Sequence, residues 1–156
     1  MNAIFLYSNA PGSGRIVNKI DFIRRRLEDT FDHVNISYAN NIDELDKLAS
    51  LACAKYDVLI FAGGDGTFHR IVNAIAKEEK RPILGYISSG TLNDFGKNFG
   101  IDKRLNRSLN IIKKGKIQQF DIGVINDKVF FTFVSAIGTF SEISYATKRK
   151  RIKTFG

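Results

Sequence analysis

The chain has 156 residues, of which 44% are hydrophobic and 26% charged, and its formal net charge is +8. This length is enough for one domain with a core, and the composition is typical of a globular protein rather than a disordered one. No apolar run reaches the roughly 18 residues that a membrane-spanning helix needs, and no signal-peptide pattern opens the chain. The single cysteine, Cys53, excludes an intramolecular disulfide and fits a reducing compartment. We therefore expect a cytoplasmic protein.

Positive charge is concentrated in three segments, which are 24–26, 96–116 and 147–153. Basic patches of this kind attract polyanions such as nucleotides, nucleic acid or anionic lipid surfaces. The alternative interpretation is a solvated basic face without a ligand. No RNA-binding signature and no helix-turn-helix spacing is present, so we do not expect a nucleic-acid partner.

Hydrophobic periodicity predicts the elements of the first 115 residues. In chain order they are a strand at 3–7, a helix at 15–31, a strand at 34–38, a helix at 43–55, a strand at 57–62, a helix from about Thr67 to 75, a strand at 83–87 and a helix at 102–115. Strands that alternate with helices favour an α/β fold, here a three-layer fold with a mostly parallel, Rossmann-like sheet.

The pattern changes near Gln118. The apolar segments 116–125 and 128–137 flank Asn126-Asp127 and predict a β-hairpin, and a basic tail from Phe140 predicts a last helix. We predict one domain at 1–125 and, at 126–156, the start of an antiparallel β-rich second domain that is largely absent. The sequence thus indicates a fragment of a longer protein.

The segment GGDGT, residues 63–67, stands between a buried strand and a helix. Ligands of open α/β sheets bind at this edge, where glycines let backbone N–H groups approach an anion and Thr67 can cap the helix. Asp65 beside a phosphate would need a cation such as Mg²⁺ between them. The alternative is a plain turn in which Asp65 is a turn or cap residue.

Other loop chemistries fit the sequence less well. The GxxxxGK[ST] pattern of a P-loop is absent, and GxGxxG fails because His69 occupies its last place. No nucleophile elbow is present, and the two histidines, His33 and His69, have no companions for a zinc site.

A second glycine loop, residues 88–94, follows the next strand and should bring Gly90, Thr91, Asn93 and Asp94 to the same edge of the sheet. A third, APGSG at 10–14, follows the first strand. Three such loops at the ends of three strands predict a phosphate-binding site.

GGDGT followed by GTLNDF at 90–95 resembles the diacylglycerol kinase catalytic family, particularly the bacterial soluble lipid kinases. GGDGT alone is shared with NAD kinases and phosphofructokinases, so GTLNDF is the discriminating element. The resemblance runs from the first strand to about residue 150 and includes FDIG at 120–123 and FFTFVSAIG at 130–138.

The resemblance implies ATP and Mg²⁺ as cofactors and a lipid at the membrane surface as substrate. The nucleotide-binding residues that it implies are Pro11, Gly12, Ser13, Gly14, Asn40, Gly63, Gly64, Asp65, Gly66, Thr67, Arg70, Gly90 and Thr91. It also implies that Asp65, Asp94 and Asp121 organise a Mg²⁺-and-water network, in which Asp65 supports catalysis. The asparagine of the family's first loop falls on Ala10, beside Asn9.

Two departures from the family pattern bear on activity. The family usually has a glutamate where this chain has Arg70, which cannot accept a hydrogen bond but could contact a phosphate. Family members are about twice as long, and their second domain supplies the general base, so no base can be named in this chain.

The leading interpretation is the nucleotide-binding part of an ATP-dependent lipid kinase that its basic clusters draw to an anionic leaflet. The alternatives are an NAD kinase-like enzyme, a nucleotide-binding module without catalysis and a purely structural domain. The oligomeric state stays open, with a homodimer among the options.

Overall fold

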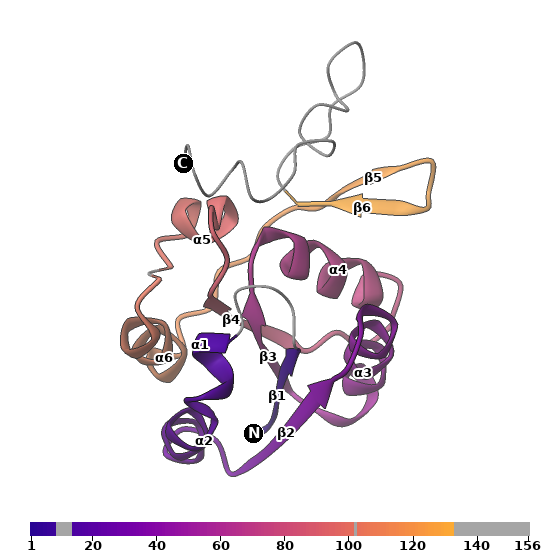
Figure 1. Cartoon of the computed structure of the whole chain (residues 1–156). Coiled ribbons are helices and arrows are strands. Elements are labelled where there is room, and N and C mark those ends of the chain that lie inside the picture. The colour runs from indigo at the N-terminus through magenta and orange to yellow at the C-terminus, as the bar shows by residue number, and fades with distance from the viewer. Residues whose placement is uncertain (9–13, 102, 133–156) are drawn as a thin grey trace.

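A computed structural model of the chain describes residues 1–8, 14–101 and 103–132. A parallel sheet lies at its centre (Figure 1). The strands are β1 (Asn2–Ser8), β2 (His33–Ala39), β3 (Val58–Gly63) and β4 (Ile83–Ser88), in the spatial order β2-β1-β3-β4. The predicted α/β fold with a mostly parallel sheet is confirmed. The first and last residues of each strand in the sheet lie within one or two positions of the predicted ones.

Helices cover both faces of the sheet and form the two outer layers (Figure 1). The helices are α1 (Gly14–Val17), α2 (Ile20–Glu28), α3 (Ile42–Lys55), α4 (Asp65–Ile75), α5 (Asp94–Asn98) and α6 (Leu105–Lys114). Helices α3 and α4 pack on one face, and α1, α2 and α6 on the other. The short helix α5 follows the carboxyl end of β4, beside the start of α4.

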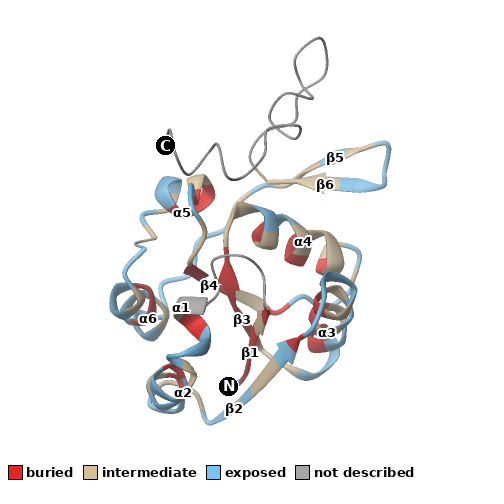
Figure 2. Cartoon of the chain, viewed as in Figure 1, coloured by how far each residue is buried: buried red, intermediate tan, exposed pale blue. Residues whose placement is uncertain are grey.

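The two faces of the sheet hold separate hydrophobic clusters, because successive side chains of a strand point to opposite sides. On β1, Ile4 and Leu6 join the cluster under α3 and α4, whereas Ala3 and Phe5 join the cluster under α2 and α6. Every residue of β3 is buried, as expected for an inner strand between two helical layers. Figure 2 shows this buried centre in red.

One predicted helix is broken in two, the helix predicted at 102–115 begins only at Leu105, and one observed helix was not predicted. The helix predicted at 15–31 is broken: at Lys19 the backbone leaves helical geometry (φ −126°, ψ 14°), and its N–H bonds the Ile16 carbonyl oxygen at 2.8 Å in a tight turn. The two short helices still present Ile16, Ile23 and Leu27 to one cluster, which explains the unbroken apolar period. Helix α5 was not predicted, since five residues are too few to show a period.

The predicted hairpin forms, with shorter strands than expected. Strands β5 (Gly123–Ile125) and β6 (Val129–Phe131) pair around Asn126 and Asp127, which have φ of 50° and 52° and so form the expected tight turn. The segment 116–122 is not a strand. Its Phe120 and Ile122 instead pack against the cluster under α4.

Asn73 of α4 anchors the hairpin. Its side-chain amide donates to the Phe130 carbonyl oxygen at 2.8 Å, and its oxygen accepts from the Phe130 N–H at 2.9 Å. The predicted boundary after residue 125 falls at the hairpin turn and stays a prediction. The predicted strand residues 133–137 and the basic tail lie outside the described residues.

No helix among the described residues is both long and apolar enough to cross a membrane.

Candidate functional site

The two described glycine loops meet at the carboxyl edge of the sheet, as the sequence predicts. Gly63 at the end of β3 pairs with Ser88 at the end of β4, and the Ser89 N–H donates to the Gly63 carbonyl oxygen at 2.8 Å. Beyond this pair the loops touch through glycines: a Cβ placed on Gly90 would lie 2.4 Å from the Gly64 Cα. Only residues without a side chain permit so close an approach.

Tyr86 and Asn93 hold the second loop against the first. The buried Tyr86 hydroxyl donates to the Gly63 carbonyl oxygen at 3.1 Å and lies 3.3 Å from Asn93 Oδ1. Asn93 is 1% exposed, and its backbone has a left-handed conformation (φ 52°). Its side-chain oxygen accepts from the Gly90 N–H at 2.9 Å, and its side-chain NH₂ donates to the Gly90 carbonyl oxygen at 2.7 Å. Sequence reasoning missed the role of Tyr86, because a tyrosine in a strand usually belongs to the core.

Helix α4 starts earlier than predicted. Gly64 is its N-cap, with an extended backbone and a carbonyl oxygen that accepts from the Phe68 N–H at 3.0 Å. Thr67 is therefore the third helical residue and does not cap the helix, which corrects the prediction. Its side chain instead lies against Gly63, where an added Cβ would be 2.3 Å away. The first N–H groups of α4 have no intrahelical acceptor and face the loop edge.

Asp65 connects the first loop to α5. Its Oδ2 accepts from the Asp94 N–H at 3.1 Å and its Oδ1 from the Phe95 N–H at 3.0 Å. The sequence predicted Asp65 as a metal-associated acid or as a turn or cap residue. The structure shows it capping a helix other than its own.

Asn40 lies at the end of β2, on the same edge of the sheet, and its own contacts shape the start of α3. Its backbone N–H and its side-chain amide both donate to Glu44 Oε2 at 2.8 Å, which lowers the pKa of the Glu44 carboxyl. Asn41 completes the cap by accepting from the Glu44 N–H at 2.9 Å. A nucleotide contact by Asn40 stays a prediction.

Arg70 is engaged with another helix. Its guanidinium forms a two-pronged ion pair with Asp46 of α3, with Nε 3.2 Å from Oδ1 and Nη2 2.5 Å from Oδ2. The pair ties α3 to α4 about one turn below the glycine loops. The predicted phosphate contact of Arg70 stays a prediction.

The three acids predicted to organise Mg²⁺ have different surroundings. Asp65 accepts the two backbone bonds, Asp94 forms an exposed ion pair with Lys97 at 2.9 Å, and Asp121 is exposed. Within the described ranges, no three or more acidic, histidine or cysteine side chains gather closely enough to hold a metal ion. The residues present do not form a protein cage for Mg²⁺, so we derive no step through a protein-bound metal.

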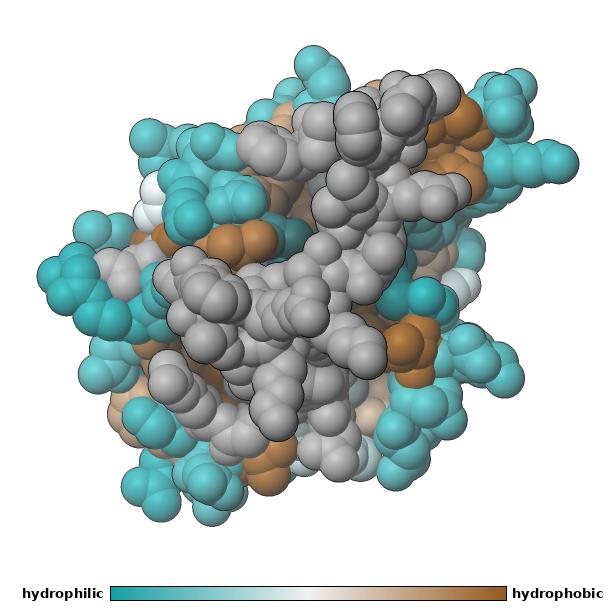
Figure 3. All heavy atoms as spheres, turned by 45° about the horizontal axis from the view of Figure 1, so that its top comes forward, coloured by the Kyte–Doolittle hydropathy of each residue, from teal (hydrophilic) through white to brown (hydrophobic). Residues whose placement is uncertain are grey.

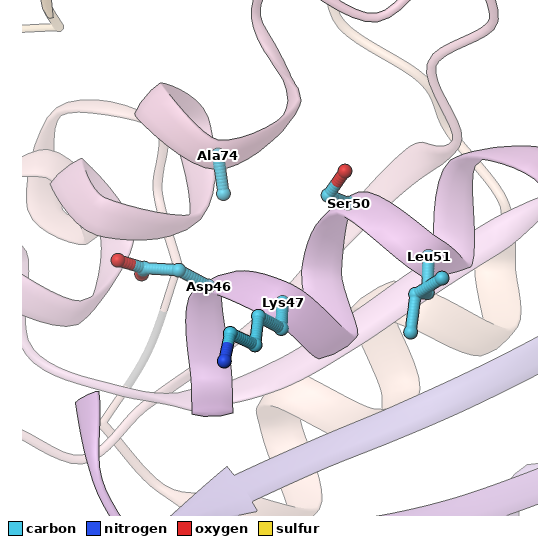
Figure 4. A pocket seen from close by; sticks show the side chains of 5 residues that line it. All are labelled: Asp46, Lys47, Ser50, Leu51 and Ala74. Atoms are coloured by element: carbon cyan, nitrogen blue, oxygen red, sulfur yellow. The ribbon is translucent and has the colours of Figure 1, made fainter. Parts of the chain in front are cut away.

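A groove of about 510 Å³ lies elsewhere, between α3 and α4 (Figure 4). The side chains that line it come from α3 (Asp46, Lys47, Ser50 and Leu51) and from α4 (Ala74). A smaller hollow of about 300 Å³ beside Arg70 shares Asp46 and Ala74 with this groove. The groove is open and holds none of the residues predicted to bind the nucleotide. We therefore place the candidate site at the glycine loops.

The surface near the carboxyl edge of the sheet is mixed. Where described residues form it, Figure 3 shows mainly hydrophilic side chains with separate hydrophobic patches. Leu92, in the second loop, is 55% exposed. The predicted loop residues Pro11, Gly12 and Ser13 lie outside the described residues, and Gly14 is the first residue of α1.

Comparison with known proteins supplies the deciding observation. The family model described as the diacylglycerol kinase catalytic domain matches residues 2–125. The chain belongs to this family. This membership agrees with the resemblance that GGDGT and GTLNDF indicate.

Individual members of the diacylglycerol kinase family match in sequence and in fold. The chain is 41% identical over 100 residues to a diacylglycerol kinase of Staphylococcus carnosus (strain TM300) and 43% over 95 residues to one of Staphylococcus aureus (strain JH9). These matches cover 64% and 61% of this chain but 32% and 30% of the relatives. A crystal structure of a diacylglycerol kinase from Bacillus anthracis superimposes with a TM-score of 0.76 at 25% identity, over 83% of this chain and 45% of that one.

The chain thus corresponds to less than half the length of these diacylglycerol kinases. The matched family region, 2–125, includes both described glycine loops, Tyr86, Asn93 and α5. The family assignment therefore rests on the part of the chain that carries the candidate site.

Proposed function

We propose that this chain is the nucleotide-binding part of an ATP-dependent lipid kinase, which transfers the γ-phosphate of ATP to a lipid hydroxyl. Family membership supports the reaction class. The observation that carries the proposal is the direct contact of the two glycine loops at the carboxyl edge of the sheet, beside the first turn of α4. That edge presents backbone donors and the positive end of a helix to an anion.

The chain's own contribution would be to bind and orient the phosphates. Backbone N–H groups of Gly64 and Gly66 would meet phosphate oxygens, with Thr91 as a side-chain donor, whereas the Gly90 N–H is held by Asn93 Oδ1 and Gly90 would contribute close backbone approach. Phosphoryl transfer depends on such positioning and on neutralising charge, which Mg²⁺ supplies when it is bound with ATP. We assign no general base among the described residues.

Two alternatives are less well supported. An NAD kinase-like enzyme would share GGDGT, but GTLNDF and the matched family model favour a lipid kinase. A module that binds ATP without catalysis is favoured by one observation, the engagement of Arg70 with Asp46. Phosphorylation of diacylglycerol by the wild-type protein would favour the lipid kinase, and phosphorylation of NAD would favour the NAD kinase-like enzyme.

Gly66→Ala tests the nucleotide site without disturbing the fold. A Cβ on Gly66 would meet no heavy atom within 4 Å, and the position is exposed in the first turn of α4, so stability should hold or rise by up to about 1 kcal/mol. The same methyl group would stand where phosphates approach the backbone. We expect Mg·ATP affinity, measured by calorimetric titration, to fall at least tenfold.

Lys77→Ala is the matched control, since it removes an exposed side chain just beyond the opposite end of α4. It should leave ATP affinity unchanged. Equal affinity of Gly66→Ala and wild type would contradict the proposed placement of the phosphates.

A further inference from the structure

We propose that Asp65 is a positioning residue that holds the second glycine loop and α5 in place through backbone hydrogen bonds, without the help of a metal ion. Its effect on ATP binding rests on the function proposed above. Its effect on the second loop does not depend on that function, and a separate experiment tests each effect.

The contact geometry is that of a helix cap supplied from outside the helix. The Asp94 and Phe95 N–H groups open α5, where a helix has no acceptors of its own. Each of them has one oxygen of Asp65, at 3.1 Å and 3.0 Å. Asn93, the residue in the N-cap position, makes no side-chain cap bond.

Asn93 cannot take over this role, because its amide is already used within the second loop. Its Oδ1 accepts from the Gly90 N–H and its Nδ2 donates to the Gly90 carbonyl oxygen. The side chain is 1% exposed, so it has little freedom to reorient. Asn93 therefore fixes the loop at Gly90, and Asp65 fixes the end of the same loop where α5 begins.

Packing keeps α5 within reach of Asp65. Phe95 is 5% exposed, and its ring stacks on Phe68 of α4 with 3.7 Å between ring centroids. Asp65 and Phe68 are both on α4, so the two hydrogen bonds of Asp65 and the ring contact of Phe68 join the same two helices. Removal of the carboxylate should release the backbone at 94 and 95 while Phe95 still retains α5.

This role and a purely metal-binding role predict opposite results when no metal is present. An unpaired carboxylate near phosphates repels ATP, so its removal should strengthen metal-free binding if Asp65 serves only a cation. If Asp65 holds the second loop, its removal disorders part of the phosphate cradle and weakens metal-free binding.

The first experiment measures amide hydrogen exchange by NMR in EDTA and without nucleotide. In Asp65→Ala, we expect exchange at Asp94 and Phe95 to be at least tenfold faster than in wild type, while Ile71 and Val72 inside α4 keep their rates. Unchanged rates at 94 and 95 would overturn the proposal. This result does not depend on whether the protein binds ATP.

Asp65→Asn keeps the test decisive if the alanine variant does not fold. The amide retains one acceptor oxygen and replaces the other with a donor, so one of the two N–H groups should lose protection and the other keep it. If Asp94 and Phe95 both keep their full protection from exchange in Asp65→Asn, the proposed role of the Asp65 hydrogen bonds is wrong.

The second experiment titrates ATP in EDTA into wild type and Asp65→Asn. A loss of affinity of threefold or more in the variant supports the loop-holding role, and a gain overturns its functional half. If wild type does not bind ATP even with Mg²⁺, the proposed function fails, while the exchange data still decide whether Asp65 holds the loop.

Discussion

Tyr86 places a hydroxyl group where both glycine loops need one. The residue is 4% exposed, and its hydroxyl bonds the Gly63 carbonyl oxygen. Burial raises the pKa of Tyr86, and the nearby negative charge of Asp65 raises it further. The hydroxyl consequently stays protonated and available as a donor well above neutral pH.

The raised pKa of Tyr86 predicts a loss of stability in alkali. The folded state keeps the proton that the unfolded chain releases near pH 10, so this contribution is complete below about pH 10 and declines as the pH rises from there towards the folded-state pKa. Urea unfolding of wild type and Tyr86→Phe between pH 8 and 11 measures the effect. We expect Tyr86→Phe to be about 1 kcal/mol less stable at neutral pH and to lose less stability in alkali.

All other ionisable groups are common to both proteins. The difference between the two pH profiles therefore isolates Tyr86. Parallel profiles would mean that its hydroxyl ionises as an exposed phenol does.

At the scale of elements, the ion pair of Arg70 and Asp46 joins the two helices of one layer. Arg70 occupies the position where the resemblance leads one to expect glutamate, and a glutamate there would face Asp46 with a like charge. The side chains are 41% and 33% exposed, so solvent screens the pair in part. We interpret Arg70 first as an element of helix packing, and its contact with ATP stays a prediction.

A double-mutant cycle with Arg70→Ala and Asp46→Ala measures this link. For a partly exposed, two-pronged pair we expect a coupling of about 0.5–1 kcal/mol in the free energy of unfolding, weaker in 1 M salt. Lys47→Ala is the control cation, because adjacent residues of a helix do not face each other. Coupling of Asp46 to Lys47 as large as to Arg70 would show a general charge effect instead of a specific pair.

At the scale of the whole molecule, folding brings together two basic segments that are far apart in sequence. Helices α2 and α6 lie side by side on one face (Figure 1), and Arg26 Nη2 donates to Asn110 Oδ1 at 2.6 Å across them. The joined surface includes Arg24 and Arg25 of α2 and Lys113 and Lys114 of α6. The third basic segment, 147–153, lies outside the described residues.

We propose that this α2–α6 surface attracts anionic membranes, which sedimentation with lipid vesicles tests. Each well-placed cation contributes about 1 kcal/mol, so Lys113→Gln with Lys114→Gln should weaken binding to vesicles rich in phosphatidylserine by about 25-fold. Binding to neutral vesicles should be weak for both proteins, and high salt should reduce the difference.

A control of equal charge is Lys77→Gln with Lys80→Gln, on the connection that follows α4 on the other face of the sheet. If both double variants lose the same affinity, net charge and not the α2–α6 surface governs the attraction.

Local sequence determined much of this protein. Periods of two and of three to four located the sheet strands and most helices, the predicted helix end at Gly115 coincides with the left-handed C-cap of α6 (φ 61°), and Asn-Asp marked the hairpin turn. These features depend on residues within a few positions of one another, so the pattern alone reveals them. The pairing of GGDGT with GTLNDF likewise indicated the family before any fold was known.

Tertiary structure decided which groups those residues meet. Asp65 bonds N–H groups 29 and 30 positions along the chain, Arg70 pairs with a residue 24 positions before it, and the two basic segments meet across α2 and α6. No periodicity encodes such partners, because they are fixed by how helices pack on the sheet. The sequence by itself thus determined where the glycine loops lie, and only the packed fold decided that a carboxylate of the first loop holds the second.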